Sequence, residues 1–145
     1  MRKVRDLFAI AALVAVLVVS PSPAWANEAP PLSLLVPRDR IERVEEGIVT
    51  WTRMGYDITV IGEGQSPCVP TGRAGFVRIC GAELERMRES LGFVPCGLWT
   101  PFEPAGLIEI DPACRWNRRV ICHEVGHTLG RPHDADPKSC MRSTS

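Results

Sequence analysis

The sequence has little of several features that define common classes of protein. Its 17 Lys and Arg residues balance 17 Asp and Glu residues, so it lacks the basic surplus with which nucleic-acid binders neutralise phosphates. No two cysteines form a CxxC pair, which argues against a cysteine-ligated metal site. Disorder is also excluded, because 45% hydrophobic residues and 23% charged residues of both signs can form a core. A chain of 145 residues with this composition predicts one globular domain.

The amino-terminal segment has the features of a secretory signal peptide. Three basic residues precede an apolar run of 13 residues, Leu7–Val19, and a small-residue cleavage site, Ala24–Ala26, follows. A membrane-spanning helix needs about 20 apolar residues, so the run is too short for an anchor. We therefore expect residues 1–26 to be removed on export. The mature chain, 27–145, is expected to be a secreted single domain with no membrane attachment.

All six cysteines lie beyond the predicted cleavage site, and an even number in an exported chain predicts disulfide bonds. They are Cys68, Cys80, Cys96, Cys114, Cys122 and Cys140. Six cysteines allow many pairings, and the sequence does not choose among them. The pairing of nearest neighbours (68 with 80, 96 with 114, 122 with 140) would close three short loops, each worth about 3 kcal/mol.

Hydrophobic periodicity predicts a small α+β domain. Its helices and a small mixed sheet are expected to pack together as an α/β layer. The predicted strands are 32–36, 58–61, 76–80 and 107–110, and the proline-rich stretch 94–104 is limited to a short edge strand or a loop. Three helices are predicted. The first starts near Asp39 and ends at Gly55, and the second covers 82–91 and ends at Gly92. The third runs from the cap Asn117 to Leu129 and ends at Gly130.

His123, Glu124 and His127 form an HExxH pattern within the last predicted helix. Residues four positions apart project from the same helix face, so both imidazoles can bind one ion at about 2.0–2.1 Å. Glu124 lies one position round the helix, where its carboxylate can act on a water without becoming a ligand. An isolated HExxH pattern is equally compatible with a solvated helix face that carries two incidental histidines.

A third histidine extends the pattern beyond the helix. Gly130 can adopt a positive φ, so the chain can turn back and His133 can supply a third nitrogen. A chance match of the whole pattern is on the order of 10⁻⁷ per starting point. These three histidines are also the only ones in the protein. The sequence therefore predicts a zinc site with His123, His127 and His133 as ligands.

The stretch HEVGHTLGRPH, followed by Met141, resembles the metzincin zinc endopeptidases, whose signature is HExxHxxGxxH and a later methionine-containing turn. The short step from His133 to Met141 is similar to the matrixin branch. Asp134 directly follows the third histidine here, and an aspartate is found at this place in the adamalysin branch and in some small bacterial secreted members. Upstream, the segment Gly106–Asp111 is similar to the strand that precedes the zinc helix in this family.

The resemblance implies a zinc metalloendopeptidase with one catalytic Zn²⁺ on the three histidines and with Glu124 as general base and later acid. Met141 is then the apolar floor of the site, and Gly130 provides the turn. Asp134 has a supporting role: it could cap a turn, orient a ligand or face water. The implied substrates are extended proteins or peptides that lie against an edge strand, for which 94–100 is the candidate.

The sequence departs from the family pattern in two respects. Only four residues follow Met141, so a truncated carboxy-terminal subdomain is expected, and a disulfide from Cys140 could support the turn in its place. The mature chain has no room for a long inhibitory pro-segment. We therefore expect the producing cell to rely on export or on a separate inhibitor protein.

Two alternatives from other classes stay open at this point. A catalytically inert secreted module of the same fold could bind zinc or proteins without turnover, if the shortened end leaves the cleft unformed. A disulfide-stapled inhibitor or toxin-like effector would carry the motif by accident. Zinc content separates the last alternative from the others, and turnover separates the first two.

Overall fold

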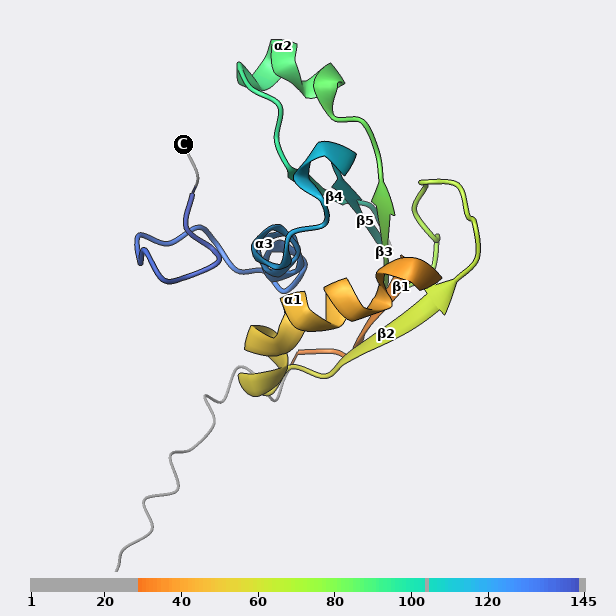
Figure 1. Ribbon diagram of the computed structural model, residues 1–145. Helices are drawn as coiled ribbons and strands as arrows, with labels where there is room; N and C mark the ends of the chain where they lie inside the picture. The colour runs from red at the N-terminus through yellow and green to blue at the C-terminus, as the bar shows by residue number, and fades with distance from the viewer. Residues whose placement is uncertain (1–28, 104, 144–145) are drawn as a thin grey trace, which may run out of the picture.

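Five β-strands form one mixed sheet in the order β2-β1-β3-β5-β4 (Figure 1). The strands are β1 (Leu32–Pro37), β2 (Ile58–Glu63), β3 (Phe76–Gly81), β4 (Gly97–Pro101) and β5 (Gly106–Ile110), and the helices are α1 (Ile41–Arg53), α2 (Arg88–Leu91) and α3 (Arg118–Thr128). This computed structural model describes residues 29–103 and 105–143, so the predicted signal peptide, 1–26, lies outside the described residues. The small α+β fold predicted from the sequence is confirmed.

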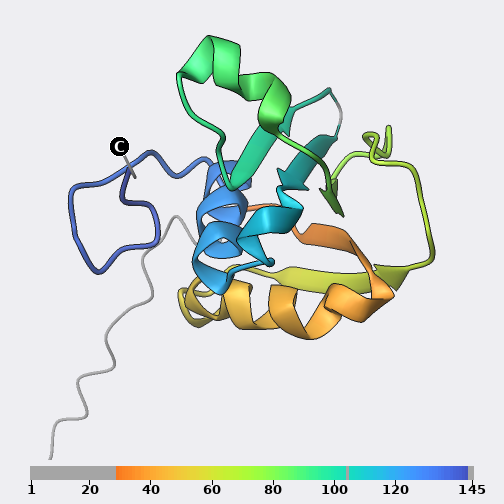
Figure 2. The ribbon, with the colours of Figure 1, turned by 45° about the horizontal axis from the view of Figure 1, so that its top comes forward.

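Helices α1 and α3 pack side by side against one face of the sheet (Figures 1 and 2). Alternate residues of β1 are buried toward them, as the period of two requires. The core also contains Val44 and Trp51 of α1 and Ile121 and Val125 of α3. A Cβ at Gly47 would lie 2.6 Å from Cγ2 of Ile121, so only glycine at this position lets the two helices approach so closely.

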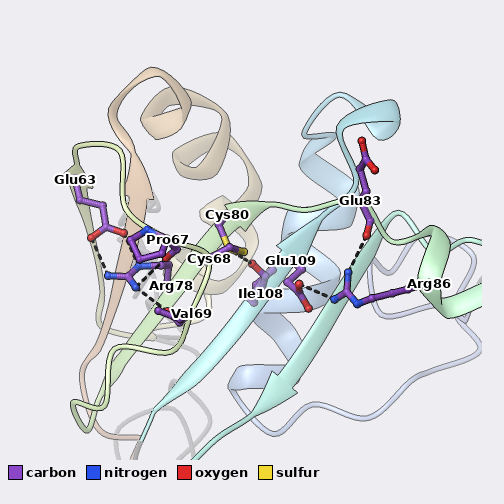
Figure 3. Close-up of a disulfide and its surroundings, with 10 residues drawn as sticks. All are labelled: Glu63, Pro67, Cys68, Val69, Arg78, Cys80, Glu83, Arg86, Ile108 and Glu109. Carbon is purple, nitrogen blue, oxygen red and sulfur yellow. Dashed lines mark hydrogen bonds and ion pairs between the residues drawn. A yellow bond between two sulfur atoms is a disulfide. The ribbon is translucent and has the colours of Figure 1, made fainter.

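The loop between β2 and β3 covers part of the opposite face of the sheet (Figure 3). Arg78 of β3 forms an ion pair with Glu63 of β2 at 2.6 Å and donates to the carbonyl oxygens of Pro67 and Val69 in that loop. The Cys68–Cys80 disulfide joins the same loop to β3. Charge pairing and a covalent bond thus hold a loop that contributes no residue to the hydrophobic core.

The cysteines pair with their nearest neighbours, as Cys68–Cys80, Cys96–Cys114 and Cys122–Cys140. This is the short-loop pairing among those that the sequence left open. Three disulfides indicate folding in an oxidising compartment. None of the helices formed by residues 29–103 and 105–143 has the length and apolarity required to span a bilayer.

The predicted helix over 82–91 is wrong in its first half. Within 82–91 only a 3-10 turn, Glu85–Met87, and the single turn of α2 form. Gly92 ends α2 with a φ of 77°, as predicted. The N–H of Ala82 donates to the carbonyl of Ile110, and the N–H of Leu84 donates to a carboxylate oxygen of Asp111. These tertiary hydrogen bonds hold the segment in a non-helical course, so local helix propensity is overridden.

Candidate metal centre

Helix α3 and the turn after it position the candidate ligands. The side chain of Asn117 accepts from the N–H of Arg119 at 2.8 Å and begins the helix as predicted. Gly130 has a φ of 73°, and the N–H of Arg131 donates to the carbonyl of Gly126 at 2.9 Å. The backbone therefore reverses directly after the helix, which returns His133 toward the helix.

The Nε2 atoms of His123, His127 and His133 converge, each 3.1 Å from the other two. The Nδ1–H of His123 donates to the carbonyl of Cys140 at 2.7 Å, and the Nδ1–H of His127 donates to that of Arg131 at 3.1 Å. Both rings therefore direct an Nε2 lone pair at the same point. Such lone pairs repel one another unless a cation lies between them. The cluster could hold a metal ion.

The spacing of the three nitrogens fits a small tetrahedral cation. Ligand nitrogens at about 2.0–2.1 Å from zinc are separated by roughly 3.3–3.4 Å, close to the distance found here. Burial lowers the pKa of both His123 and His127 below the ordinary value of 6.5, and the neighbouring rings add to this effect. Their imidazoles are thus neutral near pH 7, which is the form that binds metals.

Glu124 lies between α3 and the edge strand β4, with 7% of its surface exposed. The N–H of Trp99 donates to its carboxylate. A Cβ at Gly97 would lie 2.7 Å from Cγ of Glu124, so the strand can lie against this side chain only because Gly97 has none. Burial raises the pKa of Glu124 from 4.5 to about 7. A carboxyl group with such a pKa can both accept and donate a proton near neutral pH.

The raised pKa of Glu124 predicts a pH dependence of the stability of the metal-free protein. Between pH 4.5 and about 7 the folded chain keeps a proton that the unfolded chain has released. The free energy of unfolding therefore falls as the pH rises through this interval, by about 2–3 kcal/mol in all. Urea unfolding of the chelator-treated protein at pH 5 and pH 8 measures the fall. The variant Glu124→Gln should lack this component, whereas the histidine contributions are common to both proteins. Equal pH slopes would contradict the prediction.

The segment after His133 forms a compact loop next to α3. Asp134 organises this loop: its N–H donates to the carbonyl of Met141 at 3.1 Å, and its carboxylate accepts from the hydroxyl of Ser139 at 2.6 Å. Met141 is buried, with its Sδ 2.2 Å from where a Cβ of Gly126 would lie. Gly126 therefore allows Met141 to pack closely on the helix turn between His123 and His127.

A cleft of about 640 Å³ runs along β4 past the candidate ligands. It is lined by the three histidines, by Glu124 and by residues of the edge strand. Leu91 and Phe93, which are 43% and 53% exposed, also line it. The proline-rich stretch thus provides an edge strand rather than a loop, antiparallel to β5. Residues of this edge strand line the cleft, and the strand pairs with a neighbour on one side only.

The structure brings together the three histidines and Glu124, with Gly130, Asp134 and Met141 in the supporting turn and loop. The sequence did not predict the contributions of Gly97 and Gly126 or of the carbonyls of Cys140 and Arg131. Every residue has a backbone carbonyl, so the sequence does not indicate which one accepts a hydrogen bond. The glycine within HExxH occupies a position that the pattern leaves unspecified. Comparisons with protein-family models, curated proteins and solved structures found no significant match.

Proposed function

We propose that this protein is a secreted zinc-dependent endopeptidase of the metzincin type. The observation that carries the proposal is the convergence of three histidine Nε2 atoms 3.1 Å apart beside the buried carboxyl group of Glu124. The cleft along the edge strand β4 supports a polypeptide as the substrate, because an extended chain can pair with an edge strand. Secretion rests on the predicted signal peptide, and the three disulfides support it.

His123, His127 and His133 would hold the zinc ion. Three neutral nitrogen ligands with a further position open to water are the donor set typical of catalytic zinc. When bound, the ion supplies a Lewis acid that polarises a peptide carbonyl and lowers the pKa of water. The Nδ1–H bonds to the carbonyls of Cys140 and Arg131 fix the orientation of the first two rings.

Glu124 carries the proton transfers. Its carboxylate accepts the proton of the attacking water and then passes it to the nitrogen of the departing amine. The contact with Gly97 and the hydrogen bond from Trp99 hold the carboxylate in one position, so little reorganisation is needed during the reaction. The product is a cleaved peptide bond.

Metal analysis combined with a protease assay tests the proposal. The purified protein should contain about one zinc ion per chain and should cleave casein. Treatment with 1,10-phenanthroline should lower the rate at least about 100-fold, and added Zn²⁺ should restore it. His127→Ala should lose both zinc and activity, whereas the exposed helix variant Arg43→Ala should keep both. Zinc without turnover would identify an inert binding module, and absence of zinc would overturn the metal site as well.

A further inference from the structure

Five basic side chains gather around the metal cleft and a second hollow that adjoins it. This basic strip consists of Arg53 at the end of α1, Arg118 and Arg119 in the first turn of α3, and Lys138 and Arg142 in the carboxy-terminal loop. The second hollow, about 370 Å³, lies between α1 and the first turn of α3. Arg119 and Cys140 line both hollows, so the two hollows adjoin each other.

The side chains of the basic strip outnumber the acidic residues that line the two hollows, Glu46 and Glu124. Within residues 29–103 and 105–143, none of the five takes part in an ion pair. Glu46 is the one acidic residue that lines the second hollow, and it pairs with Arg43 at 3.2 Å. All five basic side chains are exposed. Because the whole chain has as many acidic as basic residues, this local excess is a property of the surface beside the metal centre.

The position of two of these arginines is unfavourable for the helix that carries them. The first turn of α3 contains Arg118 and Arg119 and no acidic residue. Cations at a helix amino terminus oppose the helix dipole, so they destabilise the helix rather than support it. Arg119 donates to the carbonyl of Ser139 at 3.2 Å, which holds its guanidinium group where the two hollows meet. The arrangement adds positive potential to the hollows at some cost to the helix.

We propose that the basic strip binds acidic side chains of the polypeptide substrate, at positions near the scissile bond. The inference rests on the proposed function, because the strip continues directly from the metal cleft. A protein partner is favoured over nucleic acid because the excess charge is confined to a surface that begins at the cleft and the chain has no overall basic surplus. Complementary charge of this kind speeds encounter and selects among partners.

Matched fluorogenic peptides test the inference. Three peptides share the residues around the scissile bond and carry pairs of Glu, Gln or Lys on both flanks. At low salt the kcat/KM of the zinc-loaded protein should be about tenfold higher for the Glu peptide than for the Gln peptide, and lowest for the Lys peptide. The advantage should shrink toward unity in 0.5 M NaCl. Arg118→Gln/Lys138→Gln should remove it, and Arg38→Gln/Arg73→Gln, on exposed arginines away from the strip, should keep it.

A binding measurement separates this inference from the proposed function. Labelled Glu and Gln peptides are titrated against zinc-loaded Glu124→Gln by fluorescence anisotropy. Preference for the Glu peptide that depends on Arg118 and Lys138 supports the basic strip even if no peptide is cleaved. Absence of cleavage would overturn the protease assignment alone. Equal kcat/KM and equal binding for the Glu and Gln peptides would overturn the inference and leave the protease in place. Tighter binding of an oligonucleotide than of the Glu peptide would also overturn it.

Discussion

Replacement of Glu124 by glutamine is expected to lower the kcat/KM for peptide hydrolysis by about 10²–10⁴-fold while the protein keeps one zinc ion per chain. Glutamine has nearly the same shape, so it still fits against Gly97, and its amide oxygen can still accept from the N–H of Trp99. It cannot take the proton of the attacking water. Stopped assays on casein, together with metal analysis of the same sample, measure both quantities.

The matched control for this prediction is Glu45→Gln, which makes the same chemical change on the exposed face of α1. It should leave zinc content and turnover as they are. A Glu124→Gln protein that still cleaves casein at the wild-type rate would contradict the role of general base. A variant that loses zinc would instead place Glu124 among the ligands, a position that the three converging histidines do not require.

The residues of the candidate site were predictable because the spacing that defines the site is local. His123 and His127 lie one helical turn apart, and the helix itself was predicted between Asn117 and Gly130, both of which the structure confirms. A three-dimensional cluster thus follows from eleven consecutive positions. The resemblance to metzincins depends on the same positions, which is why it extends only weakly into the rest of the chain.

The surroundings of the site were not predictable, because they depend on contacts between distant segments. The carbonyl of Cys140 orients His123 across 17 positions of sequence, and it does so through an atom that every residue has. Gly97 is defined by its contact with Glu124, which forms only when β4 lies against α3. The helix expected over 82–91 did not form in its first half for the same reason, since its first residues donate hydrogen bonds to β5 and to Asp111, and these bonds determine their course.

Removal of the Cys122–Cys140 disulfide is expected to weaken zinc binding as well as the fold. Cys122 precedes His123, and the carbonyl of Cys140 accepts the Nδ1–H of that ring at 2.7 Å. The disulfide therefore holds the hydrogen-bond partner of a candidate metal ligand in place, and loss of such partners typically costs 10–100-fold in metal affinity. The variant Cys122→Ala/Cys140→Ala should show this loss in competition with a chelating dye, and its free energy of unfolding should fall by about 2–4 kcal/mol.

The Cys68–Cys80 disulfide provides the control, because it fastens the loop on the opposite face of the sheet (Figure 3). Its loop spans 12 positions against 18, so the two stability losses should differ by less than about 1 kcal/mol. Cys68→Ala/Cys80→Ala should bind zinc as tightly as the wild type.

Ser139→Ala tests the carboxy-terminal loop with all three disulfides intact, because it removes the hydrogen bonds of the Ser139 hydroxyl with Asp134 and Met141. Equal zinc affinity in all four proteins would show that the carbonyl of Cys140 does not determine how His123 binds the ion.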